Sequence, residues 1–248
     1  MDDNETKVVS ADERHFTDFG WLKTYWLFSF SDYFDPDNLN WGALRVFNDD
    51  VVLAQKGFPT HPHREMEIVS IVLSGALSHK DSTGQEGTIK AGDVQRMSAG
   101  TGVTHSEYNH DDVPVHFYQI WMEPGVHSLS PSYEQKHFDE NMWQNNLLPI
   151  ASGQGIPGTV SLHTNATIYR SQLDKGQTVT LASELGRKVF IYLTSGELIV
   201  DEKSLNSLEQ MRLVSPGVIT IKAKKASEFI LIDSPKEAAP PEKKQAII

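Results

Sequence analysis

Short apolar runs the length of β-strands recur along the whole chain, about every 10–15 residues. They are rich in valine, isoleucine, tyrosine and phenylalanine, which favour strands, and turn-forming glycine, aspartate, asparagine and proline separate them. Only Gln135–Leu148 has a weak helical pattern. The pattern predicts an all-β chain folded as a barrel or sandwich. Strands are expected at Trp26–Phe30, Ala43–Phe47, Ile68–Leu73, Val115–Trp121, Thr178–Leu181, Val189–Leu193, Glu197–Val200, Val218–Ile221 and Glu228–Ile232.

Two of these runs, one in each half, share the same order of strand, Ser-Gly turn and strand. Ile68–Gly75 is followed by Ala-Leu-Ser-His, and Val189–Gly196, which starts 121 residues later, is followed by Glu-Leu-Ile-Val. The repetition predicts a duplicated β-barrel with domains at residues 1–146 and 147–248, divided in or just before the Gly/Pro-rich region Pro149–Gly158. We expect the tail Glu237–Ile248 and the first dozen residues to be frayed ends.

The composition narrows the possible functions. The 248 residues carry a formal net charge of −11, which disfavours direct contact with nucleic-acid phosphates. The apolar runs are far shorter than the ~20 residues of a membrane helix, and the acidic N-terminus lacks the features of a signal peptide. We therefore expect a cytoplasmic location with no membrane contact. Because there is no cysteine, any metal ion must be bound by histidine and carboxylate side chains.

The segment Gly57-Phe-Pro-Thr-His-Pro-His-Arg-Glu-Met-Glu contains the first group of candidate ligands. Side chains two residues apart on a strand share a face, so His61 and His63 would point the same way, as would Glu65 and Glu67. Pro62 cannot donate a hydrogen bond to a neighbouring strand, which places this piece at a strand start or a sheet edge. By itself, a His-x-His pair is more typical of a solvated loop than of a metal site.

A second group follows about 42 residues later, after a glycine-rich turn: His105, Glu107 and Asn109 also share one face of a strand. Facing pairs from two strands can surround one ion with four ligands. Three imidazoles and a carboxylate suit Fe, Mn, Ni, Cu or Zn and leave room for a substrate or O2. The spacing does not choose between Glu67 and Glu107 as the carboxylate. The other histidines have no partner at ligand spacing and are expected to be structural: His15, His79, His110, His116, His127, His137 and His163.

At these residues the sequence resembles the cupin superfamily and, within it, the pirin family. The first cupin motif corresponds to Gly57, His61, His63, Glu67 and Gly75, and the second to Gly92, Ser98-Ala99-Gly100, His105 and Asn109, where Ser98 replaces the usual proline. The runs His79-Lys-Asp-Ser, Met97-Ser-Ala-Gly-Thr-Gly-Val-Thr-His-Ser-Glu-Tyr-Asn and Tyr118-Gln-Ile-Trp-Met look like those of bacterial pirins. The resemblance is dense between Trp21 and Phe138 and loose beyond.

The resemblance implies a bicupin: two double-stranded β-helix (jelly-roll) barrels, of which the N-terminal one binds a single divalent transition metal ion (Fe, Ni, Mn, Cu, Co or Zn). In pirins the ligands match His61, His63, His105 and Glu107, whereas the position of Glu67 is not a ligand. The C-terminal half has no His-x-His, so its barrel is expected to be metal-free. Pirins are often monomeric.

Bacterial pirins resemble quercetin 2,3-dioxygenases, which open the central ring of a flavonol with O2 and release carbon monoxide. The resemblance implies the same activity here, with Glu107 as the base for the flavonol hydroxyl. Phe58, Pro59 and Met97 are expected near the substrate because they adjoin the ligands in sequence. The alternative is a metal-dependent redox-sensing or regulatory protein that binds another protein. A metal-free structural or carbohydrate-binding barrel is a third hypothesis.

Overall fold

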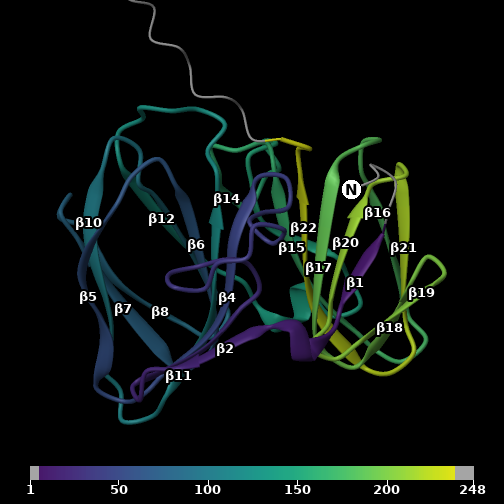
Figure 1. Ribbon diagram of the computed structural model, residues 1–248, viewed down its shortest axis with the longest axis horizontal. Helices are drawn as coiled ribbons and strands as arrows, with labels where there is room; N and C mark the ends of the chain where they lie inside the picture. Colours follow the sequence, from purple (N-terminus) through teal and green to yellow (C-terminus); the bar gives the residue numbers. More distant parts are fainter. Residues whose placement is uncertain (1–5, 238–248) are drawn as a thin grey trace, which may run out of the picture.

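The computed structural model describes residues 6–237 and consists almost entirely of β-strands (Figure 1). The helices among these residues are two 3₁₀ turns, η1 (Ala11–Glu13) and η2 (Glu140–Met142). The strands form two sheets of seven and two of four, arranged as two barrels. The four-stranded sheets lie on the outer sides of the molecule, and the seven-stranded sheets face each other in the middle (Figure 1). The prediction of an all-β chain is confirmed.

The N-terminal barrel combines one large and one small sheet. The large sheet has the order β12-β9-β6-β11-β4-β3-β2, and the small sheet has the order β5-β10-β7-β8. The strands of the large sheet are β2 (His15–Asp18), β3 (Leu22–Trp26), β4 (Leu44–Val52), β6 (Glu67–Ser74), β9 (Asp93–Ser98), β11 (Val115–Met122) and β12 (Ser132–His137). Those of the small sheet are β5 (Lys56–His63), β7 (Ala76–Asp81), β8 (Glu86–Lys90) and β10 (Val103–Asn109).

The C-terminal barrel repeats this plan, with orders β1-β20-β17-β22-β15-β13-β14 and β16-β21-β18-β19. Its large sheet contains β1 (Lys7–Val9), β13 (Leu148–Ser152), β14 (Val160–Ser161), β15 (Thr167–Leu173), β17 (Lys188–Ser195), β20 (Gln210–Val214) and β22 (Ser227–Ser234). Its small sheet contains β16 (Thr178–Ala182), β18 (Glu197–Val200), β19 (Lys203–Asn206) and β21 (Val218–Ala223). The two predicted Ser-Gly turns join β6 to β7 and β17 to β18. Gly75 and Gly196 adopt φ of +75° and +99° there, which glycine tolerates without strain.

Three local expectations were wrong. The first dozen residues are not all frayed: β1 pairs with β20, so this N-terminal strand belongs to a sheet of the C-terminal barrel, in the position that β12 has in the other. Gln135–Leu148 is not a helix, because β12 continues to its third residue and only η2 follows. Of Trp26–Phe30, only Trp26 is in a strand; the next two residues pack into the core outside any strand. Residues 1–5 and residues 238–248 of the tail lie outside the described residues.

One large apolar core lies between the two seven-stranded sheets and contains residues of both barrels. Phe47 and Tyr118 from the N-terminal barrel contact Phe190 and Tyr192 from the C-terminal barrel, with ring centroids 5.2–5.7 Å apart. Aromatic side chains of this size bury more apolar area than any others. The two barrels are therefore held together by a continuous hydrophobic core, which fixes the walls of each barrel relative to the other.

The interiors of the barrels differ. The C-terminal barrel is filled by a single apolar cluster that includes Leu198, Val200 and Ile221. The N-terminal barrel has two smaller apolar clusters and also buries polar and ionisable side chains on its inner strands. Buried ionisable groups destabilise a fold unless they are paired or bind a ligand. The N-terminal barrel is therefore where a functional site is expected.

Candidate metal centre

Three histidine rings converge inside the N-terminal barrel. His61 and His63 lie near the end of β5, and His105 lies on the neighbouring strand β10, directly opposite His61 in the strand register. The Nε2 atoms of His61 and His105 are 3.1 Å apart. One nitrogen from each of the three rings lies within 4.8 Å of the others. The predicted alternation along both strands therefore brings these three side chains together.

The environment keeps His63 and His105 in the neutral form that binds metal. Burial and the neighbouring imidazole of His61 lower the pKa of His63 to about 4. Burial and the neighbouring imidazoles lower the pKa of His105 to about 2. Nδ1–H of His61 donates to the Pro59 carbonyl oxygen at 2.8 Å, which leaves the Nε2 lone pair free. Neutral imidazoles with a free nitrogen are the state that a metal ion requires.

Glu107 lies two residues beyond His105 and is 1% exposed. Its Oε2 accepts a hydrogen bond from Gln119 Nε2 at 2.8 Å, whereas its Oε1 is buried without any hydrogen-bond partner. Burial raises the pKa of the Glu107 carboxyl to about 7. Ligand atoms of Glu107, His105 and His79 also lie within 4.8 Å of one another, so these residues form a second possible metal-binding group. His105 belongs to both this group and the three-histidine group.

These donors fit one divalent transition ion. Two nitrogens that each lie about 2.0–2.1 Å from an ion are separated by roughly 3 Å, close to the observed Nε2–Nε2 distance. The unpartnered carboxylate oxygen of Glu107 is the kind of buried atom that normally has a partner in a folded protein. Gly57 lets β5 approach β10 closely, because a Cβ atom there would lie 2.2 Å from the backbone oxygen of Glu107.

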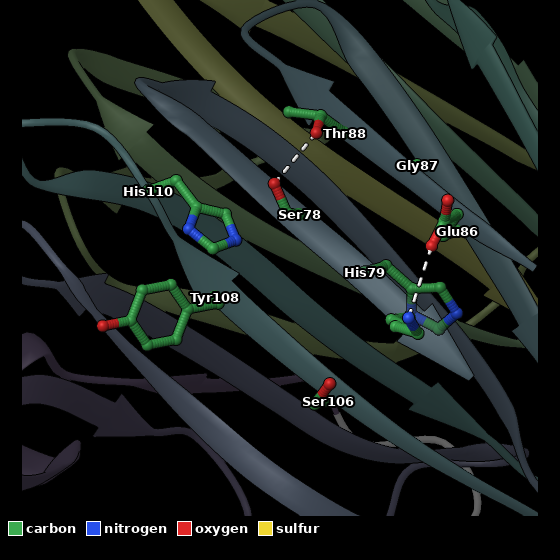
Figure 2. A pocket seen from close by; sticks show the side chains of 9 residues that line it. Ser78, His79, Glu86, Gly87, Thr88, Ser106, Tyr108 and His110 are labelled. Atoms are coloured by element: carbon green, nitrogen blue, oxygen red, sulfur yellow. Dashed lines mark hydrogen bonds and ion pairs between the residues drawn. The ribbon is translucent and has the colours of Figure 1, made fainter. Parts of the chain in front are cut away.

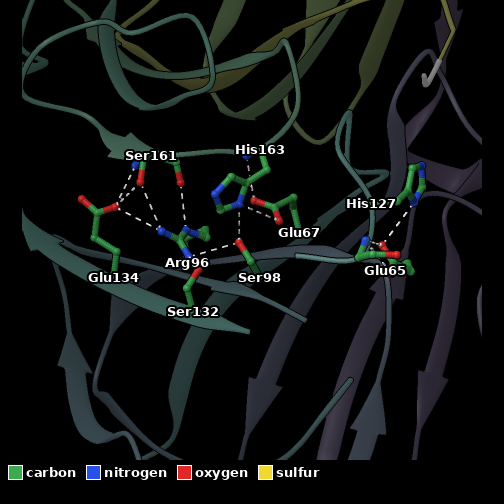
Figure 3. A network of polar contacts seen from close by, with 10 residues as sticks. Glu65, Glu67, Arg96, Ser98, His127, Ser132, Glu134, Ser161 and His163 are labelled. Atoms are coloured by element: carbon green, nitrogen blue, oxygen red, sulfur yellow. Dashed lines mark hydrogen bonds and ion pairs between the residues drawn. The ribbon is translucent and has the colours of Figure 1, made fainter. Parts of the chain in front are cut away.

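The other candidate carboxylates point elsewhere (Figure 3). Glu67 accepts a hydrogen bond from the backbone N–H of His163 at 3.0 Å and so contacts the C-terminal half. Glu65 has φ of +48°, so the chain turns after β5 and the two glutamates do not lie on one continuous strand as expected. The Glu65 carboxylate instead contacts His127 and the backbone N–H of Ser128.

Arg96 is the centre of the same inter-barrel network (Figure 3). Arg96 is only 4% exposed. Its guanidinium donates hydrogen bonds to the Ser161 carbonyl oxygen at 2.8 Å and to Ser132 Oγ at 2.6 Å. It also forms an ion pair with Glu134 at 3.3 Å. The network joins β9 and β12 to β14, so the first barrel is held to the second by polar contacts as well as by the shared core.

An aromatic cavity of about 330 Å³ opens beside the histidines. His61 and His63 line it, and the ring of Trp121 lies 4.8 Å from that of His63. Most of the remaining wall is apolar: Phe19, Trp21, Leu22, Trp26, Phe30, Phe58 and Pro59. Its polar lining is Ser31, Asn48, Asp50 and Gln119. A mostly apolar cavity with a few polar groups is typical of a small-molecule site.

Two of the three expected pocket residues, Phe58 and Pro59, line this cavity. Met97 does not; it packs in a separate apolar cluster with Ile68 and Val103. Met97 faces that cluster, against which Trp121 of the cavity wall also packs. Adjacency in sequence was therefore a reliable guide for residues next to the first histidine pair and misleading for the second motif.

A second hollow, of about 550 Å³, lies on β7, β8 and β10 (Figure 2). Ser78 and Thr88 are hydrogen-bonded at 2.9 Å, and Lys80 forms an ion pair with Glu86 at 3.6 Å. Both side chains of that ion pair are more than 70% exposed. His79, between Ser78 and Lys80, also lines this hollow, but it is 2% exposed and reaches His105 in the interior. This face is therefore a solvated surface, and the same strand contributes His79 to the interior.

Several residues of the site were not identified from the sequence. His79 was expected to be structural, yet it is part of a possible metal-binding group with His105. Gln119 and Trp121 were not singled out: Trp121 Nε1 donates to Gln119 Oε1 at 3.2 Å, which fixes the amide that donates to Glu107. Their shared parity on β11 was the signal that could have found them. Asp50, which lines the cavity, was also missed, and no pattern in the sequence pointed to it. Burial raises the pKa of its carboxyl to about 7.

Comparison with known proteins places these features in context. The family described as Pirin matches residues 9–122, and the family described as Quercetinase C-terminal cupin domain matches residues 149–234. Quercetin 2,3-dioxygenase of Escherichia coli is 37% identical over 226 residues, covering 91% of this chain and 96% of that protein. A pirin-like protein of Caulobacter vibrioides is 38% identical over 218 residues, covering 88% and 94%. The bacterial pirin YhhW of Escherichia coli in complex with nickel(II) superimposes with a TM-score of 0.87 at 34% identity, covering 93% of this chain and 99% of that one.

Proposed function

Because this chain belongs to the pirin family and shares its bicupin fold, we propose that it is a metal-dependent dioxygenase that cleaves the central ring of flavonols such as quercetin with O2 and releases carbon monoxide. The proposed metal ligands are His61, His63, His105 and Glu107. The observation that carries the proposal is the aromatic cavity that has two of these histidines in its wall. A flat polyphenol matches a cavity of aromatic rings with few polar groups.

The side chains of this chain have separate tasks in the proposed reaction. The rings of Trp21, Trp26 and Trp121 would bind the substrate rings and exclude water from them. When bound, a divalent ion would supply Lewis-acid stabilisation for the oxyanion of the substrate. Since O2 adds to the anion of the flavonol, a group of the protein must first take up the proton of the 3-hydroxyl.

Glu107 is the proposed base for that proton. Its Oε1 is buried without a hydrogen-bond partner, and a carboxylate that loosens from the ion would accept the proton there. Gln119 holds Oε2 in place, and Trp121 in turn holds Gln119. The carboxylate thus keeps Oε2 fixed, while Oε1 would bind the ion and, on loosening from it, receive the proton.

The test is turnover of quercetin by purified full-length protein loaded with one defined ion. We expect a kcat/KM above the ~10⁴ M⁻¹s⁻¹ lower end of typical enzymes, with carbon monoxide formed in equal amount to the quercetin consumed. In Glu107→Gln protein with its metal content verified, kcat should fall by about 100-fold or more. The matched control is Glu65→Gln, because that carboxylate contacts His127 outside the site. Full activity of Glu107→Gln would remove Glu107 as the base.

One observation favours the second candidate, a metal-dependent redox-sensing or regulatory protein. Phe16, Phe19 and Phe34 are 48%, 49% and 72% exposed, and they lie in the segment that also supplies walls of the cavity. Exposed aromatic side chains of this kind are common at protein–protein interfaces. A kcat/KM far below ~10⁴ M⁻¹s⁻¹ in the same assay would favour this role, with quercetin cleavage incidental.

A further inference from the structure

A line of three side chains extends from the metal centre into the wall of the barrel. His105 Nδ1 lies 3.3 Å from His79 Nδ1, and His79 Nε2 lies 3.1 Å from Asp81 Oδ2. The side chains of His79 and Asp81 are only 1% and 2% exposed. His79 also stacks on Tyr133, with ring centroids 5.0 Å apart. The opposite edge of His105, its Nε2, faces His61.

Asp81 determines which atoms donate and which accept along this line of hydrogen bonds. Its Oδ1 accepts hydrogen bonds from Thr83 N at 2.8 Å, from Thr83 Oγ1 at 2.6 Å and from Gln85 N at 3.2 Å. Although burial acts in the opposite direction, these bonds lower the pKa of the Asp81 carboxyl, so it is an anion that can only accept hydrogen bonds. The group that faces Asp81 Oδ2 must therefore be a donor, and that group is Nε2–H of His79.

The placement of the remaining ring protons follows. A neutral imidazole has one N–H, so His79 with its proton on Nε2 must accept at Nδ1. The donor to that nitrogen is Nδ1–H of His105, which leaves the Nε2 of His105 as a lone pair. His61 also has a lone pair on Nε2, because its Nδ1–H donates to the Pro59 carbonyl oxygen. Two lone pairs then face each other across 3.1 Å, and a cation between them relieves the repulsion.

We propose that Asp81 and His79 are positioning residues that hold His105 in its Nδ1-protonated tautomer and so preset the centre for a metal ion. The proposal depends on the metal centre of the proposed function and not on its substrate. A histidine ligand whose second nitrogen is held by hydrogen bonds has a fixed tautomer and ring orientation, and losing such a partner typically weakens metal binding by about 10- to 100-fold.

The C-terminal barrel supports this assignment because it lacks the same line of side chains. Counted from the Ser-Gly turns, Val200 has the position of His79. Val200 pairs with Ile221 on β21, as His79 pairs with Glu107 on β10. Both residues of the C-terminal pair are apolar and belong to the filled interior of that barrel. The carboxylate–histidine line therefore occurs together with the candidate ligands and not as a general feature of the fold.

The first measurement is made on wild-type protein of full length, freed of metal by a chelator. Long-range ¹H–¹⁵N correlation spectra report which nitrogen of each histidine ring is protonated. We expect His105 to be protonated on Nδ1 and His79 on Nε2. A proton on Nε2 of metal-free His105 overturns the proposal, whatever the behaviour of any variant.

The second measurement uses Asp81→Asn, which has the same shape and reverses the direction of the line. The Asn oxygen can keep the bonds to Thr83 and Gln85, while its amide N–H₂ replaces Oδ2 and donates to His79 Nε2. His79 must then donate to His105 Nδ1, which moves the His105 proton to Nε2, the nitrogen that binds metal. We expect this tautomer in the spectra and an affinity for nickel(II) and zinc about 10- to 100-fold below that of the wild type.

The matched control is Asp93→Asn, because Asp93 makes the same kind of contact with a histidine, His137 Nδ1 at 2.7 Å, outside the centre. It should leave the His105 tautomer and the metal affinity unchanged. An unchanged tautomer and affinity in Asp81→Asn overturns the proposal. If that variant does not fold, His79→Phe preserves a stacked ring on Tyr133 and should lower the affinity to a similar extent. None of these readouts uses quercetin, so a failed turnover assay and a failed positioning role are distinguishable.

Discussion

The sharpest prediction concerns the proton that Glu107 must release when it binds a metal ion. Burial raises the pKa of this carboxyl to about 7, so metal-free protein carries a proton there below neutral pH. A metal ion binds the carboxylate form, and metal and proton therefore compete for the same group. With a pKa of 7, the competition lowers the apparent metal affinity about 11-fold at pH 6 and by only about a tenth at pH 8.

The perturbation is Glu107→Gln, which keeps the three histidines and removes the titrating group. Between pH 8 and pH 6 the apparent affinity of the wild type should fall about tenfold more than that of the variant, equivalent to about 1.4 kcal/mol. Competition with a chromophoric chelator measures both affinities at each pH. Calorimetry in buffers of different ionisation enthalpy counts the protons released, and the wild type should release about one more proton than the variant at pH 6.

A matched control and a clear refutation are available. Glu65→Gln changes a carboxylate that contacts His127 and Ser128 and should leave the wild-type pH dependence intact. Parallel affinity curves for wild type and Glu107→Gln would refute the reasoning, because they would mean either that Glu107 is not a ligand or that its carboxyl is already ionised at pH 6.

Three further predictions concern stability. Burial raises the pKa of the Asp50 carboxyl to about 7, so its contribution to stability is fully present below its unfolded pKa and is lost as the pH rises through 7. In denaturant titrations, the unfolding free energy of metal-free wild type should fall by about 2 kcal/mol more than that of Asp50→Asn between pH 5 and pH 7. Equal losses in the two proteins would contradict this. Gly57→Ala would push β5 away from β10 and should lower both the unfolding free energy, by about 1–3 kcal/mol, and the metal affinity. The control is Gly87→Ala, where an added Cβ would meet only the side-chain ends of Gln135 and Tyr133, at 3.2 and 3.4 Å, and which should change neither. Arg96→Met removes the charged hydrogen bonds from Arg96 to Ser161 of the C-terminal barrel and should lower the unfolding free energy by about 1.5–3 kcal/mol. The control is Lys80→Met, which breaks only an exposed ion pair. Equal effects of the two substitutions would show that the inter-barrel network is not stabilising.

The polar interior of the N-terminal barrel has a thermodynamic consequence. Where the C-terminal barrel packs apolar side chains such as Val200, the N-terminal barrel buries His79, His105 and Glu107. A buried ionisable group lowers stability until a ligand satisfies it. An ion bound in this centre stabilises the folded state by mass action, so added nickel(II) or zinc should raise the melting temperature.

The sequence by itself was sufficient for the strands and for the three histidines. Strand recognition depends on local alternation of apolar and polar residues and on turn residues, and eight of the nine expected runs lie within or overlap observed strands over most of their length. The His-x-His pair and His105 could be placed on facing strands because side chains two apart share a face. Trp26–Phe30 failed because Leu27 and Phe28 are buried by the second barrel, which no local pattern shows.

Only the tertiary structure decided which distant groups meet. Glu67 and Glu107 have equivalent parity in the sequence, yet Glu67 contacts His163 of the other half while Glu107 turns into the barrel beside His105. Strand β1 joins the sheet of the C-terminal barrel through backbone pairing, which almost any three-residue segment could make. His79 reaches His105 because β7 pairs with β10 in one particular register. Alternation gives each side chain a face, but register and long-range packing determine its neighbours, and the chemistry of a site depends on those neighbours.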